Sequence, residues 1–201
     1  MKKIAIDIVL IPPPSIAQQA IAMNRGLADT AAANYILNAK TCVPHITVLM
    51  GLIEREALPK LYDQLSIVMQ QTQPLPLELT GVYIATLPDG NNVSSLVVKK
   101  ELALQQFHES ILNDARFLLS HDAVTAEMFY EDPPVNEFAV SWVSKFMQTS
   151  VHGNYQPHIT LGIGKASPLA HPIHFTVSQL AVCHLGNYCT CRDILWSTKL
   201  E

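Results

Sequence analysis

The sequence contains one short pattern twice, and the residue types in it suit acid and base chemistry. The pattern is PHITV at residues 44–48, followed by Gly51, and it recurs as PHITL at residues 157–161, followed by Gly164. The offset from the histidine to the closing glycine is the same in both copies. One such stretch alone would fit an ordinary half-buried strand. Two matched copies predict a duplicated unit whose halves face each other across a groove.

Each copy is expected to form a short strand that presents a histidine and a threonine together. Alternate side chains of a strand project to the same face, so His45 and Thr47 point together, as do His158 and Thr160. The apolar residues between them anchor the opposite face in the core. If a pseudo-twofold axis relates the halves, the imidazoles flank a point on which the two hydroxyls converge. Such a site has the size of a phosphate group.

This arrangement predicts hydrolysis of a cyclic phosphodiester. Opening the ring requires water to attack phosphorus in line with the departing alkoxide, so a base and an acid are needed on opposite sides. Imidazole has an ordinary pKa of about 6.5, so one histidine can be neutral while the other is protonated near neutral pH. The hydroxyls of Thr47 and Thr160 can donate hydrogen bonds to the non-bridging oxygens, where charge accumulates. We expect no metal and no other cofactor.

At His45-Ile46-Thr47 and His158-Ile159-Thr160 the sequence resembles the two-histidine (2H) phosphoesterase superfamily, in particular its branch of 2′-5′ RNA ligase-like proteins and cyclic phosphodiesterases. The resemblance implies a bilobal α+β fold and metal-independent cleavage or formation of 2′-linked phosphodiesters. It also implies that the two histidines are the catalytic pair and that the two threonines bind the phosphate. We expect His158 to activate water and His45 to protonate the leaving oxygen, with the roles reversed in ligation. A module that binds a nucleotide or an RNA end without turnover is the alternative.

Two tyrosines are candidate substrate-binding residues. Tyr155 lies three residues before His158 and can reach the groove to stack on a base, or it can close the lobe instead. Tyr35 is a second candidate for stacking. Other histidines lack a paired hydroxyl, and we expect them at surface or loop positions: His108, His121, His152, His171 and His174.

The cysteines are expected to be thiols, because a chain of this size does not depend on disulfides, and a reducing cytoplasm is the expected location. They are Cys42, Cys183, Cys189 and Cys191. The alternative is a zinc site. With a two-residue turn at residues 186–187, His184 would lie opposite Cys189 and share a face with Cys191. A fourth ligand is not evident, so apolar packing explains these cysteines better and no metal is assigned.

The elements that must position the two motifs include both strands and helices. Strands are predicted at residues 3–11, 45–50, 75–87, 94–99, 158–163, 173–185 and 188–200. Helices are predicted at residues 15–29, capped by Ser15, and at 54–71, 101–119 and 135–149. Several strands pair antiparallel, so the class is α+β. We predict a bilobal, duplicated, pseudo-twofold fold in one domain over residues 1–201, with two antiparallel-rich sheets facing a central cleft and helices outside.

The amino-acid composition limits the kinds of binding partner that we expect for this protein. The chain has 201 residues, of which 49% are hydrophobic and 15% charged, so it can bury a real core. Its apolar runs fall short of the roughly 20 residues that cross a bilayer. The net charge of -4 argues against binding to long nucleic acid, because such binding needs clustered Lys and Arg. We therefore expect a monomer that binds a small nucleotide or an RNA terminus with a cyclic phosphate, without a membrane or a long duplex as partner.

Overall fold

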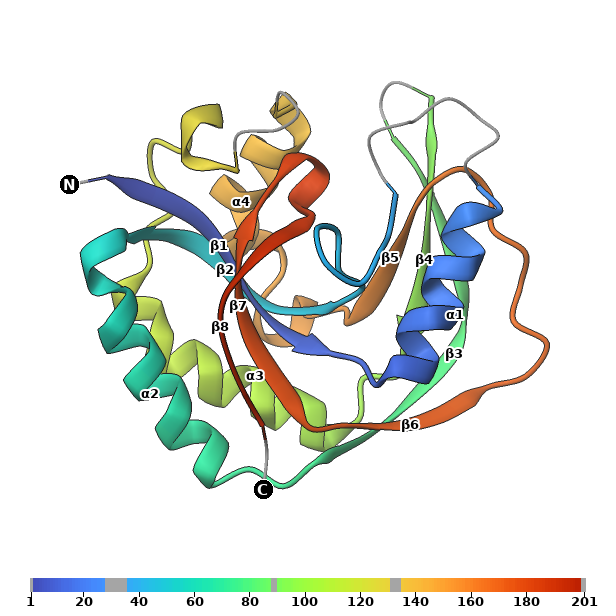
Figure 1. Ribbon diagram of the computed structural model, residues 1–201, viewed down its shortest axis with the longest axis horizontal. Helices are drawn as coiled ribbons and strands as arrows, with labels where there is room; N and C mark the ends of the chain where they lie inside the picture. The colour runs from blue at the N-terminus through green and yellow to red at the C-terminus, as the bar shows by residue number, and fades with distance from the viewer. Residues whose placement is uncertain (1, 28–35, 88–89, 131–134, 200–201) are drawn as a thin grey trace.

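The computed structural model describes residues 2–27, 36–87, 90–130 and 135–199, and the strands in these ranges form two sheets (Figure 1). Sheet A has the order β2-β1-β7-β8, formed by β1 (Lys3–Ile11), β2 (Ile46–Glu54), β7 (Gln179–Leu185) and β8 (Cys191–Lys199). Sheet B has the order β5-β4-β3-β6, formed by β3 (Leu75–Thr86), β4 (Asn92–Val98), β5 (His158–Ile163) and β6 (Ile173–Val177). All neighbouring strands pair antiparallel, which confirms the predicted α+β class.

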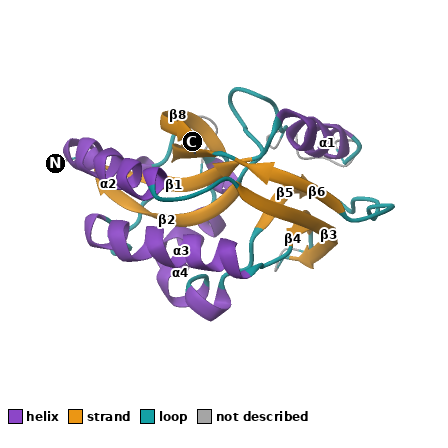
Figure 2. Ribbon diagram, turned by 90° about the horizontal axis from the view of Figure 1, so that it is seen from below, coloured by secondary structure: helices purple, strands orange, loops and turns teal. Residues whose placement is uncertain are grey.

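The described helices lie outside the sheets, and Figure 2 shows α3 and α4 on one side of the strands with α1 on the other. Their bounds are α1 (Pro14–Arg25), α2 (Leu58–Gln70), α3 (Leu102–Ala115) and α4 (Glu137–Thr149). Each is shorter than its predicted range. The N-cap of α1 is Pro13 rather than Ser15, because proline at the first helical position already has the helical φ. Asp29, the predicted end of the first helix, and Leu200, the predicted end of the last strand, lie outside the described residues.

The two halves interlock through their helices. Helix α1 precedes β2 in the chain but packs on β5, whereas α4 precedes β5 but packs on β2. Strands β2 and β5 are edge strands of sheets A and B, and they contact each other. The exchange of helices therefore holds together the two strands that carry the motifs. Within the described ranges, none of the helices has the length and apolarity needed to cross a membrane.

The predicted strand at residues 173–185 is two strands in different sheets. β6 pairs with β3 in sheet B, and after Ser178 the chain enters sheet A as β7, which pairs with β1. The alternating pattern continues across this point because a strand has an inner and an outer face in either sheet. The sequence pattern therefore did not reveal the change of sheet.

The predicted two-residue turn after β7 is wrong, and so is the geometry of the alternative zinc site. A short 3-10 turn at Asn187–Cys189 connects β7 to β8, so that His184 lies opposite Asp193 and not opposite Cys189. The His184 ring instead bonds through Nε2 to the carbonyl of Met128 at 3.1 Å. Over the described residues, no group of three or more His, Cys, Asp or Glu side chains could hold a metal ion.

The expectation that all four cysteines are thiols is also wrong. Cys183 on β7 and Cys191 on β8 form a disulfide, and their Cα atoms are 5.4 Å apart. Cys42 and Cys189 are free and buried. Two of the four cysteines therefore do not have the thiol form on which the expectation of a reducing cytoplasm depended.

Candidate functional site

The two His-x-Thr motifs lie at the start of β2 and in β5, with the alternation that the sequence predicted. Ile46 and Ile159 are fully buried, whereas the histidine and threonine on either side of each isoleucine are partly exposed. The two glycines differ in role. β5 ends immediately before Gly164, but β2 continues through Gly51 to Glu54. A side chain at Gly51 would meet the Leu119 Cβ and the His121 ring, both 3.0 Å from the position of its Cβ, so this glycine permits close packing.

Both motif strands carry a β-bulge at the same position. In the pairing of β2 with β1, the register shifts directly after Thr47, so Val48 is the extra residue. In the pairing of β5 with β4, it shifts directly after Thr160, so Leu161 is the extra residue. A bulge bends its strand and redirects the neighbouring side chains. The halves therefore repeat in hydrogen-bond register as well as in sequence.

A buried helical side chain stabilises each bulge. Nδ1 of His108 on α3 donates to the carbonyl oxygen of Val48 at 2.9 Å, and Nδ2 of Asn24 on α1 donates to that of Leu161 at 2.7 Å. Both donors are at most 3% exposed. The expectation that His108 lies at the surface is therefore wrong. The sequence signal for it was a polar residue on the apolar stripe of a predicted helix.

The two catalytic candidates are held in the same tautomer. Nδ1 of His45 lies 2.7 Å from the carbonyl oxygen of Val43, and Nδ1 of His158 lies 2.8 Å from that of Gln156. A carbonyl oxygen can only accept, so Nδ1 carries the hydrogen in both rings. Each neutral ring therefore has its lone pair on Nε2, where it can take a proton from a ligand.

The pKa values of both motif histidines are lowered. The pKa of His45 is lowered to about 4, mainly because burial disfavours the charged imidazole. The hydrogen bond to Val43 raises this pKa, and the positive charge of His158 lowers it. Burial also lowers the pKa of His158, which the hydrogen bond to Gln156 partly offsets. The effect of the His158 charge on His45 means that the two rings lie within electrostatic range of each other.

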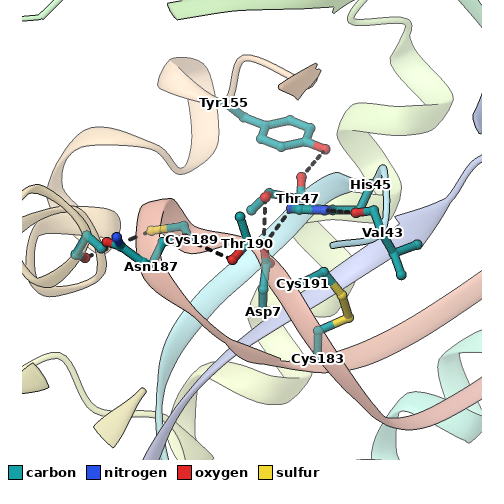
Figure 3. A network of polar contacts seen from close by, with 11 residues as sticks. Asp7, Val43, His45, Thr47, Tyr155, Cys183, Asn187, Cys189, Thr190 and Cys191 are labelled. Carbon is teal, nitrogen blue, oxygen red and sulfur yellow. Dashed lines mark hydrogen bonds and ion pairs between the residues drawn. A yellow bond between two sulfur atoms is a disulfide. The ribbon is translucent and has the colours of Figure 1, made fainter. Parts of the chain in front are cut away.

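A buried carboxylate, which was not among the predicted site residues, lies beside the first motif. The Thr47 hydroxyl donates to Oδ2 of Asp7 at 2.7 Å, and Nε2 of His45 is 3.7 Å from the same oxygen (Figure 3). Asp7 is fully buried, and this burial raises the pKa of its carboxyl well above the ordinary value, although the bond from Thr47 lowers it. The signal in the sequence was a single acid within the apolar first strand.

The second motif has no matching acid. Asp7 on β1 lies opposite Met50, three residues after Thr47, and the equivalent position opposite Ile163 on β5 is occupied by Val93. Among the described groups, none hydrogen-bonds to the hydroxyl of Thr160. The duplicated halves therefore differ at one buried position, where the first has an ionisable carboxyl and the second an apolar side chain.

Tyr155 closes the lobe and presents no free ring face for stacking on a base. It is 3% exposed, its ring is stacked on His108 with centroids 4.0 Å apart, and its hydroxyl donates to the Thr47 carbonyl oxygen at 3.0 Å. Figure 3 shows this hydroxyl directed at the backbone of the first motif. Tyr35, the other candidate, lies outside the described residues.

Comparison with solved structures shows the same fold in other proteins. TT0787 of Thermus thermophilus aligns with a TM-score of 0.57 and 15% identity over 98% of each chain. Escherichia coli LigT complexed with NADP+ aligns with a TM-score of 0.52 and 12% identity over 99% of each chain. The apo form of LigT gives a TM-score of 0.51 and 11% identity over 99% of this chain and 98% of LigT. At these identities the likeness establishes the fold alone.

Comparison of the sequence itself points to one family. A search of curated proteins found no match. The family model described as the 2′-5′ RNA ligase superfamily matches residues 12–185, a range that contains both His-x-Thr motifs. Because the match covers most of the chain, this protein belongs to the 2′-5′ RNA ligase superfamily of 2H phosphoesterases, the family that the doubled motif indicated.

Proposed function

We propose that this protein hydrolyses a cyclic phosphodiester by two-histidine acid and base catalysis without a metal. The substrate is a 2′,3′-cyclic nucleotide, an RNA end with a 2′,3′-cyclic phosphate, or a cyclic sugar phosphate. One observation carries the proposal: each half presents an imidazole with Nε2 as its acceptor, together with a hydroxyl on the same face of an edge strand. Membership of a 2H phosphoesterase family supports the reaction class.

In this proposal His45 is the base and His158 is the acid, the reverse of the assignment expected from sequence. Burial and the charge of His158 both lower the pKa of His45, which favours a neutral His45 as the base. Nε2 of His45 then takes a proton from the attacking water, and Nε2 of protonated His158 gives one to the leaving alkoxide. Phosphorus gains the water oxygen and loses the ring oxygen, so a phosphomonoester is the product. In ligation the RNA 5′-hydroxyl replaces water as the nucleophile, so the two histidines keep these roles, contrary to the reversal expected from sequence.

Thr47 and Thr160 are assigned to the non-bridging phosphate oxygens. Hydroxyl donors aimed at those oxygens stabilise the charge that accumulates as water attacks. The structure of LigT, which shares the fold, has been solved in complex with NADP+. A protein with this fold can therefore bind a nucleotide. The net charge of -4 favours a small nucleotide or one RNA end over a long duplex. We expect one chain to contain the complete site and to act as a monomer.

The test is hydrolysis of 2′,3′-cyclic nucleotides in the presence of EDTA. We expect a single monophosphate isomer from the wild type and no product from His45→Ala or His158→Ala. His174→Ala, which alters an exposed side chain on β6, is the matched control and should be as active as the wild type. Full activity in either site variant would overturn the mechanism.

The family description favours 2′-5′ RNA ligation as the second candidate. RNA with a 2′,3′-cyclic phosphate would be incubated with RNA carrying a 5′-hydroxyl, and joined product would be compared with hydrolysed product. Tight binding of one nucleotide per chain, with no product of either kind, would instead indicate a binding module.

A further inference from the structure

Thr47 has a donor conflict that Thr160 does not have. A hydroxyl carries one hydrogen, and the hydrogen of Thr47 is directed at Oδ2 of Asp7 across 2.7 Å. While it stays there, Thr47 presents only lone pairs to an oxyanion, which repel it. The hydroxyl of Thr160 has no such acceptor, because Val93 occupies the equivalent position. Phosphate binding at the first motif therefore requires the hydrogen-bond direction between Asp7 and Thr47 to change.

The surroundings of Asp7 favour its neutral form. The side chain is fully buried, and Oδ1 has no hydrogen-bond partner among the residues that the structure describes. A buried carboxylate with one unsatisfied oxygen is unfavourable unless it is paired with a fixed cation. Within the described ranges, the one ion-pair partner of Asp7 is His45, whose own burial disfavours the charged imidazole. Burial of both groups therefore favours neutral forms of both.

The other ionisable groups near Asp7 do not compensate a negative charge. Tyr155, from the segment before β5, and Cys189, from the turn after β7, lie near Asp7. Burial raises the pKa of both groups, and the charge of Asp7 raises it further. Cys183, opposite Asp7 on β7, is in the disulfide and does not titrate. None of these neighbours carries a positive charge, so none offsets the cost of ionising the buried Asp7.

We propose that Asp7 is a positioning residue that is protonated when an oxyanion is bound. At pH values where Asp7 is ionised in the free protein, binding is coupled to uptake of one proton. Protonated Asp7 donates to Oγ1 of Thr47, so that the Thr47 hydroxyl donates to the oxyanion. The proton comes from solvent, and the Thr47 hydrogen rotates from Asp7 to the anion without leaving its oxygen. Two neutral hydrogen bonds in series replace a buried charge beside the anion. This role rests on the proposed function for its substrate, but anion binding alone tests it.

Sulfate is a suitable probe because it does not titrate over the working pH range. Its dissociation constant would be measured against pH for the wild type and for Asp7→Asn, whose amide is a permanent donor of similar shape. Above the pKa of Asp7 in the free protein, sulfate binding to the wild type requires uptake of one proton. The wild-type dissociation constant should therefore rise with pH more steeply than that of Asp7→Asn, by up to about tenfold per pH unit. The same pair of curves is also measured in a His45→Ala background, because His45 lies 3.7 Å from Asp7 and its titration shifts when Asp7 is replaced. Parallel curves would overturn the proposal.

Two further measurements separate this relay from simple charge repulsion. In a Thr47→Val background, Asp7→Asn should no longer change the slope, because the hydroxyl that transmits the effect is missing. A slope change that persists there would show repulsion alone and overturn the relay. In wild-type protein, sulfate should increase the infrared C=O band of a protonated carboxyl, and Asp7→Asn should lack that increase.

The outcome is independent of the hydrolysis assay. A normal proton linkage in a protein that hydrolyses no cyclic phosphodiester would disprove the proposed function and leave the relay intact. Hydrolysis with no difference in slope between the wild type and Asp7→Asn would disprove the relay alone.

Discussion

The hydroxyl of Tyr155 donates a hydrogen bond to the backbone carbonyl of Thr47 across 3.0 Å. Tyr155 lies three residues before the second motif histidine, so this bond links the chain entering the second motif to the backbone of the first. β2 is an edge strand, and a buried carbonyl on its outer side needs a donor from outside the sheet. The bond thus satisfies a backbone group and ties the two motifs together.

Replacement of Tyr155 by phenylalanine should destabilise the fold and slow the reaction. Loss of the hydroxyl leaves the Thr47 carbonyl unpaired, which costs about 1–2 kcal/mol in the free energy of unfolding. Small displacements of a phosphate-binding group also reduce turnover, here by about tenfold. Urea unfolding and kcat for a 2′,3′-cyclic nucleotide would measure the two effects. Tyr83→Phe, at a side chain 61% exposed, is the control and should change neither.

Replacement of His108 by leucine should destabilise the fold more. The His108 ring donates to Val48 through Nδ1 and accepts from the backbone N–H of His152 at Nε2, so the change leaves two backbone groups unpaired. We expect a loss of about 2–4 kcal/mol, measured by urea unfolding. His174→Leu, at an exposed site on β6, should differ from the wild type by less than about 0.5 kcal/mol. An equal effect of both substitutions would contradict the role of His108.

Local patterns in the sequence were sufficient to predict the second motif strand and part of the first, since β2 extends four residues beyond its predicted end at Met50. β1 and β5 have the predicted bounds, and the His-x-Thr alternation places its apolar residues inside as expected. These features depend on neighbours two residues apart, because side chains alternate along any strand. The class of the fold and the pairing of histidine with threonine in each motif could therefore be predicted without coordinates.

The partners of the motifs could not be predicted, because they come from distant parts of the chain. Thr47 meets Asp7 across 40 residues, Val48 meets His108 across 60, and Leu161 meets Asn24 across 137. Each contact depends on strand register or helix packing, which a local pattern does not contain. The change of sheet at Ser178 is hidden for the same reason, since the alternation is identical in either sheet.

The dependence of kcat/KM on pH should be bell-shaped with its maximum on the acid side of neutrality. The base must be neutral, and the pKa of His45 is lowered to about 4, so the rate falls below that pH. The acid must be protonated, and burial lowers the pKa of His158 below 6.5, so the rate falls above this lowered value. Since kcat/KM reports the free enzyme, these are the relevant groups. A profile that is flat, or that is highest in alkali, would refute the assignment.

Asp7→Asn should stabilise the protein increasingly as pH rises. Burial raises the pKa of Asp7 in the fold above its ordinary value of 3.8, so between those two values the folded chain holds a proton that the unfolded chain has lost. The stability that Asp7 contributes is full below 3.8 and is lost as pH rises through the raised pKa. Asparagine does not titrate, so the difference in unfolding free energy should move in favour of the variant by up to about 1.4 kcal/mol per pH unit. Thermal or urea unfolding of both proteins across the acid and neutral range would measure this, and a constant difference would contradict it.

The Cys183–Cys191 disulfide should contribute to both stability and site geometry. It closes a short loop with a sequence separation of 8, for which the chain-entropy estimate is about 2–3 kcal/mol. The Cys191 carbonyl also accepts from the backbone N–H of Val43 at 3.2 Å, and the Val43 carbonyl orients His45. Cys183→Ala should therefore be less stable by about that amount and less active. A reductant should lower the melting temperature of the wild type and leave that of the variant unchanged. Intact mass and thiol counting check the premise, and four free thiols in unreduced wild-type protein would contradict it.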